Sequence, residues 1–239
     1  MSPKSVFTEE ALRFLRGLKR NNRREWFEKR REIYERTVKA PMLALVERLT
    51  QGMTGYAPAH VRPAAKCVFR IYRDTRFSAD KAPYKTHLGA WWSRAGLIKT
   101  SGAGFYLHIG ADEFVIAAGA YMPEKNQLLA IRRHLLAHHG DWKRLIEDRR
   151  LLRSFVVHDP MALARAPKGF PADHPATEWI KWRQWGITAH LPAETALRPS
   201  LAADIEKRFR LAAPLVDFLN APLVASERPR SAWIAPLPR

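Results

Sequence analysis

One stretch of the chain, residues 70–87, has the residue types needed to bind an anion. It holds five lysine or arginine residues, two aspartates, two tyrosines and a histidine. Arginine offers a planar fork of donors to phosphate or carboxylate, lysine supplies a point charge, and tyrosine and histidine add hydrogen bonds. Because two carboxylates cannot neutralise five cations and unpaired buried charges are costly, the stretch predicts an anion-binding site.

The alternation of the expected strands selects the members of this site. In the first strand Phe69 and Ile71 are expected to face the core. Arg70, Tyr72 and Asp74 alternate with them and are expected to share the opposite face, toward the ligand. A later strand over residues 104–109 places tyrosine and histidine on its polar face, and Gly102, Gly104 and Gly119 would let a ligand approach the backbone. The candidate ligand-binding residues are Arg70, Tyr72, Arg73, Asp74, Arg76, Lys81, Tyr84, Lys85, His87, Tyr106 and His108.

Three interpretations of these residues stay open. The first is a protein that binds a phosphate-bearing ligand or nucleic acid. The second is an enzyme with hydrolase, phosphoryl-transfer or acyl-transfer chemistry, in which tyrosine or histidine moves protons and arginine stabilises developing negative charge. The third is a structural network in which Asp74 and Asp80 hold buried arginines. Spacing alone assigns no catalytic residue, no metal ligand and no cofactor.

The overall charge is compatible with an anionic partner. The chain has 41 basic and 23 acidic residues, for a formal charge of +18. Such an excess favours nucleic acid, nucleotides or other phosphorylated molecules. Arginine outnumbers lysine 28 to 13, a bias that the base composition of the coding DNA can produce with no partner involved. The charge therefore supports the anion site without requiring it.

Cysteine content and hydropathy predict a cytoplasmic protein with no membrane partner. The single cysteine, Cys67, excludes a disulfide within the chain and a thiolate zinc cluster. The N-terminal residues lack the apolar segment of a signal peptide. The longest apolar run, residues 114–122, is too short to span a bilayer. Nothing in the sequence predicts an oligomeric state.

Two shorter motifs carry less weight. Ser78 and Lys81 match the Ser-x-x-Lys pair of acyl-transfer enzymes, but the companion motifs of that chemistry are missing. His134 and His138 lie four residues apart, a spacing that can bind a metal on a helix. Two neighbouring arginines would repel a cation there, so surface histidines near a helix end are the favoured interpretation.

Hydrophobic periodicity predicts an α+β fold. The period is helical before residue 50, changes to two in the middle of the chain, and becomes helical again. We expect a central antiparallel meander sheet of about four strands, flanked by N-terminal and C-terminal helices. The predicted single domain covers residues 1–220, and a proline-rich tail covers residues 221–239. The expected strands are residues 67–72, 87–92, 104–109 and 114–121.

Local signals predict where several helices begin. Asn22 and Glu25 have the spacing of a capping box that opens a second helix. Pro123 suits the first position of a helix after the sheet, and Ser200 suits the cap of the last one. Aromatic residues every three positions from residue 179 to 185 predict a late helix with a buried tryptophan stripe; they are Trp179, Trp182 and Trp185.

The motifs together resemble a known family. They are Asn21-Asn22-x-x-x-Trp26-Phe27, the run from Phe69 to His87, Gly104-Phe105-Tyr106-Leu107-His108 and Pro167-Lys168-Gly169-Phe170. The chain, from about Phe7 to Leu219, is similar to the family called domain of unknown function 2461. This resemblance implies that these residues form the family signature, and it implies no activity. It adds Asn22 and Lys168 to the candidate site.

Overall fold

The computed structural model describes residues 5–97 and 102–226, and a five-stranded antiparallel sheet forms its centre. The strand order is β1-β2-β3-β5-β4, so the first three strands form the expected meander. The α+β class is confirmed, with five strands in place of about four. The strands are β1 (His87–Trp92), β2 (Gly104–Gly110), β3 (Glu113–Ala120), β4 (Val156–Val157) and β5 (Trp185–Pro192).

Helices precede and follow this sheet, as the periodicity predicts. The N-terminal helices are α1 (Glu9–Arg20), α2 (Arg24–Glu28), α3 (Arg31–Tyr34), a π-helical turn (Glu35–Lys39), α4 (Ala40–Met53), a 3-10 turn (Pro58–His60) and α5 (Ala64–Cys67). Those after the meander are α6 (Lys125–Ala137), α7 (His139–Ile146), α8 (Arg149–Ser154), α9 (Thr177–Ile180), a 3-10 turn (Ala193–Leu197) and α10 (Leu201–Ser226).

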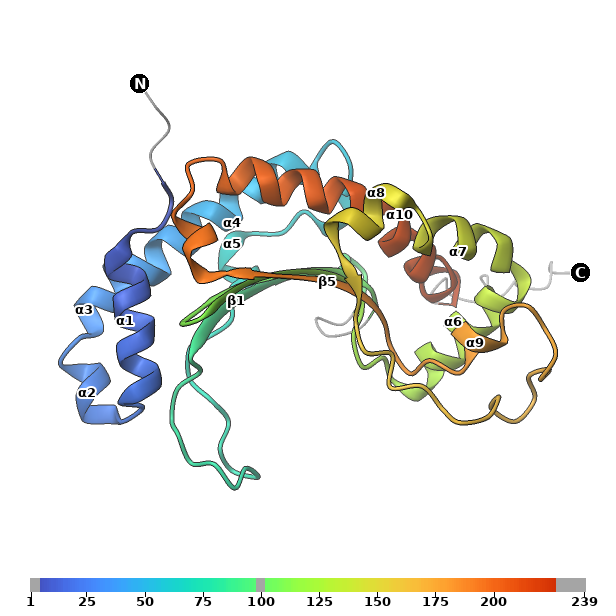
Figure 1. Cartoon of the computed structure of the whole chain (residues 1–239), viewed down its shortest axis with the longest axis horizontal. Coiled ribbons are helices and arrows are strands. Elements are labelled where there is room, and N and C mark those ends of the chain that lie inside the picture. Colours follow the sequence, from blue (N-terminus) through green and yellow to red (C-terminus); the bar gives the residue numbers. More distant parts are fainter. Residues whose placement is uncertain (1–4, 98–101, 227–239) are drawn as a thin grey trace, which may run out of the picture.

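One face of the sheet is covered by helices. Alternate residues of β1, β2, β3 and β5 point to this face, and nearly all of them are apolar and buried. The helix α10 packs on β2 and β3 and also on α4, so the two helices lie along the same side of the sheet (Figure 1). In this layer the Phe209 ring contacts two rings of the sheet. Its centroid lies 5.4 Å from that of Trp92 and 5.1 Å from that of Phe105.

The opposite face has a different composition. The strand register places Trp91 beside Tyr106, and Val115 between His108 and His190. Among the described residues no helix crosses this face; α1–α3 lie at one end of the sheet, and α6 and α9 lie at the other (Figure 1). We call it the open face. The polar side chains of β2, Tyr106 and His108, lie on this face, as their alternation with buried residues predicts.

The first expected strand, residues 67–72, is wrong as a regular strand. Cys67 ends α5, and the chain then pairs only at two isolated bridges, Val68 with Ala90 and Tyr72 with Tyr84. Phe69, expected in the core, is half-buried on the open face, with its ring centroid 6.5 Å from that of Tyr106. The short helix α5 changes which of the following residues face the core. The alternation of six residues alone cannot reveal that a helix ends at Cys67.

The late helix with its tryptophan stripe is also wrong. The helix α9 has only four residues, and Trp185 begins the strand β5. Trp179 and Trp182 pack against the core and Trp185 is fully buried, so the three rings do turn inward. Spacing by three resembles a helix, whereas pairing with β3 imposes the extended conformation on residues 185–192.

Boundaries of other helices differ from the sequence signals. The residue that precedes the first turn of α2 is Arg23 and no side-chain cap is formed, so the capping box of Asn22 and Glu25 is wrong. Glu124 caps α6 through a capping box with Gln127, and Pro123 lies outside the helix. Two prolines near the end of the chain, Pro214 and Pro222, lie inside a helix and do not end it.

The last helix, α10, is longer than the sequence indicates. It begins directly after Ser200, as expected, but continues through Pro214 and Pro222 to Ser226, so the tail predicted from residue 221 begins inside a helix. Buried Leu215, Leu219 and Leu223 hold this segment against the core. The remainder of that tail lies outside the described residues. Neither α10 nor any other described helix has a sufficiently long apolar stretch to cross a bilayer.

Candidate functional site

The signature stretch forms a loop with a closed neck. Tyr72 and Tyr84 form a β-bridge, and two backbone hydrogen bonds flank it: Arg73 N–H donates to Pro83 O at 2.9 Å, and Lys85 N–H donates to Ile71 O at 2.8 Å. Residues 74–82 lie beyond this neck. The loop, teal in Figure 1, projects from the side of the sheet opposite α4 and α10. We call residues 74–82 the signature loop.

Asn22 attaches the neck to the N-terminal helices. Its side-chain amide donates to Tyr84 O at 2.8 Å and accepts from Tyr84 N–H at 3.0 Å. The Tyr84 ring then stacks on Phe27 of α2, with centroids 4.1 Å apart. The Asn22 side chain is therefore unavailable for helix capping because it pairs with backbone 62 residues away in sequence. The structure brings Asn22 to the loop neck, where its side chain holds the loop.

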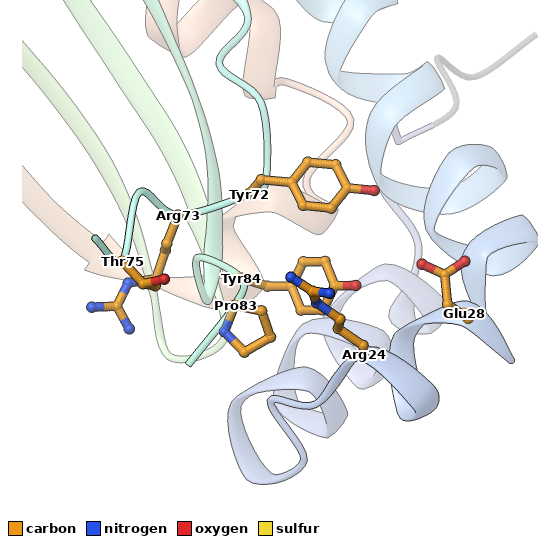
Figure 2. A pocket seen from close by; sticks show the side chains of 7 residues that line it. All are labelled: Arg24, Glu28, Tyr72, Arg73, Thr75, Pro83 and Tyr84. Carbon is orange, nitrogen blue, oxygen red and sulfur yellow. The ribbon is translucent and has the colours of Figure 1, made fainter. Parts of the chain in front are cut away.

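A pocket of about 310 Å³ lies between α2 and the loop neck. Figure 2 shows Arg24 and Glu28 of α2 on one side of it and the two tyrosine rings on the other. Glu28 is paired with Arg31 at 2.6 Å, and Arg31 also donates to the Tyr72 hydroxyl at 3.2 Å. The lining residues are Arg24, Glu28, Tyr72, Arg73, Thr75, Pro83 and Tyr84.

Arg24 is the cation of this pocket that sequence reasoning missed. Its guanidinium is exposed and forms no hydrogen bond or ion pair with any described residue. Arg24 lies four residues before Glu28, a spacing that on a helix favours pairing of the two side chains. Glu28 in fact takes Arg31 as its partner. The one available signal was the position of Arg24, two residues after Asn22.

The two aspartates of the loop pair with two of its arginines. Asp74 accepts from the Arg76 guanidinium at 2.7 Å, and that bond holds the pKa of the Asp74 carboxyl below its usual value. Asp80 accepts from Arg73, and its own pKa is lowered first by the Ala82 N–H and then by Arg73. The Asp80 side chain is 67% exposed and Arg76 77% exposed. The predicted pairs form, but three of their four side chains are well exposed, and exposed pairs contribute little stability.

Three further cations of the stretch, Arg70, Lys81 and Lys85, have no carboxylate partner among the described residues, and of these Lys81 donates to a backbone carbonyl, Thr75 O. Lys85 is half-buried, with its ammonium 5.1 Å from the centroid of the Phe69 ring. Burial, and then repulsion by Arg70, lowers the pKa of Lys85. Burial and the charge of Lys85 likewise lower the pKa of His87. These positive groups lie close enough to disfavour one another, a situation that a bound anion relieves.

A row of polar side chains continues from His87 across the open face. The His87 and His108 rings are 4.6 Å apart, and the Tyr106 hydroxyl lies 3.1 Å from His108 Nδ1. Glu113 lies 3.4 Å from His108 Nε2 and 2.7 Å from His190 Nδ1. Sequence reasoning missed Glu113 and His190, because only the β3–β5 register brings the two strands together. In the described ranges, no three acidic, histidine or cysteine side chains are arranged to hold a metal.

The partners in this row set the tautomer of His108. Glu113 accepts from Nε2–H, so Nδ1 accepts the Tyr106 hydroxyl proton. Burial, and then the positive charge that His87 can carry, lowers the pKa of His108 to about 4, while burial raises the pKa of Tyr106 to about 12. Both groups are therefore neutral near pH 7. An anion bound beside them would raise the pKa of His108 and favour its protonation.

The structure divides the predicted site into two groups. One lies at the loop and its neck, and the other lies at the edge and surface of the open face. The predicted Gly104 and Gly119 do not expose backbone, because Trp91 and the Trp185 carbonyl occupy the space beside them. The loop group is Asn22, Tyr72, Arg73, Asp74, Arg76, Lys81 and Tyr84; the open-face group is Lys85, His87, Tyr106 and His108; the charge of Arg70 acts on both groups, through Asp74 and Lys85.

Lys168 belongs to neither group. It is exposed in a turn in which Phe170 N–H donates to Pro167 O at 3.1 Å and Gly169 has a positive φ of 86°. It makes no hydrogen bond or ion pair with other described residues. The glycine in this motif serves the turn conformation, which gives a structural reason for its presence.

The comparisons with known proteins agree with the resemblance seen in the sequence. The model of a family described as conserved hypothetical protein, DUF2461, matches residues 10–218 of the 239-residue chain. This range includes α1, the signature loop, the whole sheet and most of α10. A search of curated proteins finds no match.

Proposed function

The chain belongs to the DUF2461 family, and from the geometry of its own residues we propose that it is a cytoplasmic protein that binds phosphate-bearing ligands, nucleic acid in particular, at the signature loop. The observation that carries the proposal is a set of three cations at the loop whose side chains form neither an ion pair nor a hydrogen bond with a described residue. Arg24 lies on one side of the loop neck, Lys85 belongs to the open-face group, and Arg70 is close enough to Lys85 for its charge to act on it. Their neighbours Arg31, Arg73 and Arg76 are paired.

The electrostatics of Lys85 support an anionic ligand. A lysine that is half-buried and repelled by an arginine loses part of its preference for the charged form. Phosphate beside Arg70 and Lys85 would restore that preference and would accept charge-assisted hydrogen bonds from both side chains. His87, whose pKa is lowered by the same charges, would gain a proton more readily in the complex.

The arrangement of the cations favours a polyanion over a small phosphorylated molecule. Neighbouring residues of an extended chain point to opposite sides. Tyr84 turns toward Phe27 of α2, while Lys85 turns toward Phe69, which contacts Tyr106 on the open face. The free cations therefore lie on both sides of the neck. One phosphate group cannot contact both sets, whereas a nucleic-acid backbone can pass from one to the other.

Salt dependence of binding tests this proposal. The measurement is fluorescence anisotropy of a labelled single-stranded oligonucleotide at several salt concentrations. Each phosphate contact contributes about 0.7 to the slope of log K against log salt for single strands. We expect Arg70→Gln and Lys85→Gln each to lower affinity several-fold and to reduce the slope by roughly that increment, and the double variant to lower affinity more than tenfold.

A charge-matched control separates a site from general attraction to a basic protein. Arg149 is exposed at the start of α8 and forms no ion pair with a described residue. Arg149→Gln removes the same charge as Arg70→Gln and should change affinity much less. Equal losses in the two variants, or no binding at low salt, would contradict the proposal.

The row on the open face supports an enzyme as the second candidate. A hydroxyl, an imidazole and a carboxylate joined by hydrogen bonds are the groups that general acid–base catalysis uses. Turnover in a screen of phosphatase, nuclease and hydrolase substrates, abolished by Tyr106→Phe with an unchanged melting temperature, would support it. Unchanged turnover in that variant would exclude a role for the Tyr106 hydroxyl.

A further inference from the structure

The signature loop is braced by its own side chains. The Arg73 guanidinium donates to Asp80, to Ala82 O at 3.2 Å and to Ser78 Oγ at 3.4 Å. Lys81 Nζ crosses the loop to Thr75 O at 3.0 Å. These bonds join the two sides of the loop near its neck, so the residues between them are presented in a defined conformation.

The tip of this braced loop carries an aromatic ring in solvent. Phe77 is 96% exposed, while Tyr121, the next most exposed large apolar side chain among the described residues, is 62% exposed. The Arg76 guanidinium lies 5.8 Å from the centroid of the Phe77 ring and is held by Asp74 at 3.0 and 2.7 Å. Phenylalanine contributes to stability through burial. Phe77 makes no such contribution, and its ring on a braced loop is open to contact with a ligand.

The chemistry around Phe77 selects the kind of ligand. Proteins that bind single-stranded nucleic acid combine cations that follow the phosphates with exposed aromatic rings on which bases stack. The stretch offers both, with five cations against two carboxylates. A duplex already stacks its bases, whereas an unpaired base has a free face. A bilayer requires a wider apolar surface than one ring for stable binding.

From these observations we propose that the signature loop binds single-stranded nucleic acid, with a base stacked on Phe77 and the adjoining phosphates held by Arg70, Lys85 and Arg24. This inference rests on the proposed function, since it names the partner and the contact for the same site. Arg76 presents its guanidinium beside the ring and adds a second planar surface to which a base can stack.

The test compares two polyanions that differ only in the presence of bases. The probes are a labelled oligothymidylate of about 12 nucleotides, within the range of site sizes of single-strand-binding folds, and inorganic polyphosphate of similar length. We expect Phe77→Ala to weaken oligothymidylate binding about tenfold, equivalent to about 1.4 kcal/mol, and to leave polyphosphate binding unchanged. Phe77→Trp should preserve affinity, and Phe77→Leu should lose most of it because it keeps apolar area without a stacking surface.

Matched controls make each outcome decisive. Tyr121→Ala removes another exposed aromatic residue and should leave both affinities unchanged. If Phe77→Ala binds oligothymidylate normally while Arg70→Gln weakens both probes, the stacking inference is overturned and the proposed function stands. If wild-type protein binds neither probe, both are overturned. Binding to phosphatidylserine vesicles that depends on Phe77, with oligothymidylate binding that does not, would identify a membrane surface as the partner and overturn the inference.

Discussion

Asn22 and Asn220 make the same pair of hydrogen bonds in two different environments. The Asn22 amide bonds to both backbone groups of Tyr84, at 2.8 and 3.0 Å, beside the pocket. The Asn220 amide bonds to both backbone groups of Ala103, at 3.0 and 2.9 Å, in the core. Asn22 is half-exposed, whereas Asn220 is 1% exposed.

The difference shows how one interaction serves either stability or positioning. At Ala103 no water can replace the amide, so removing it leaves two buried backbone groups without partners. At Tyr84 solvent can replace part of the lost bonding, but solvent does not orient the loop. We therefore infer that Asn220 stabilises the start of β2, and that Asn22 sets the position of the signature loop relative to α2.

The largest effect is expected on the buried side. Asn220→Ala should lower the free energy of unfolding by about 4 kcal/mol, since each of two buried backbone groups loses a partner at a cost of about 2 kcal/mol. Urea unfolding measures this loss. Asn126 is exposed on α6 and its side chain forms no hydrogen bond with a described residue, so Asn126→Ala is the matched control and should be neutral or slightly stabilising. A loss below 1 kcal/mol in Asn220→Ala would refute its stabilising role.

Gly102 allows a second perturbation of the same buried contact. Its φ is +77°, and a Cβ there would lie 2.5 Å from Leu97 Cδ1 and 2.7 Å from Asn220 Oδ1. Gly102→Ala should cost about 3 kcal/mol through backbone strain and displacement of Asn220. Gly96 has a φ of +83° and open space around it, so Gly96→Ala should cost only the strain, about 1–2 kcal/mol. Equal melting temperatures for the two variants would show that Asn220 is not displaced.

Acid should lower the free energy of unfolding because His60 is buried in the same layer. Its Nδ1–H donates to Trp92 O at 3.0 Å, its Nε2 is buried without a partner, and burial lowers its pKa to about 4. Because the unfolded state binds a proton below pH 6.5 and the folded state only below pH 4, stability falls as the pH drops through this window. Between pH 7 and pH 5 the loss from His60 is about 2 kcal/mol.

The measurement compares urea unfolding at the two pH values for wild-type protein and His60→Gln. His108, with a pKa also near 4, acts in the same direction and retains its share in that variant. The variant should therefore show a smaller, but not zero, loss of stability on acidification. An unchanged difference between pH 7 and pH 5 would contradict the assignment to His60.

The smallest stability effect is expected at Asn22. Asn22→Ala should lower the free energy of unfolding by about 1 kcal/mol, yet weaken oligonucleotide binding several-fold because the neck of the loop is no longer attached to α2. Asn21 is the matched control, since its amide bonds to Gly17 O at 3.0 Å at the end of α1 and makes no bond to the loop. Asn21→Ala should lose similar stability and keep its affinity. Equal affinities in the two variants would remove the distinction between a stabilising and a positioning asparagine.

Much of the fold could be predicted because its signals are local. The three strands of the meander and the last helix follow from alternation and periodicity within single segments. The strand β5 could not be found in this way, since Trp179, Trp182 and Trp185 have a helical spacing that pairing with β3 overrides. The strand β4, with two residues, is too short to show any period.

The candidate site was predictable as a stretch of sequence and not as an arrangement in space. The charge density of residues 70–87 identified the loop and most of its cations. Spacing could not show that Arg73 and Arg76 are paired while Arg70 and Lys85 are not. Nor could it bring Arg24 to the loop, since the contact depends on Asn22 binding Tyr84.

The sequence by itself determined the α+β class, the family and the location of the signature loop, because composition and periodicity are properties of neighbouring residues. The tertiary structure alone decided which cations lack partners, that Glu113 and His190 join His108, and that Phe77 stands in solvent. Pairing, burial and exposure depend on residues that are distant along the chain. For the same reason Asn22 and Asn220, which are the same type of residue, act differently where the fold places them.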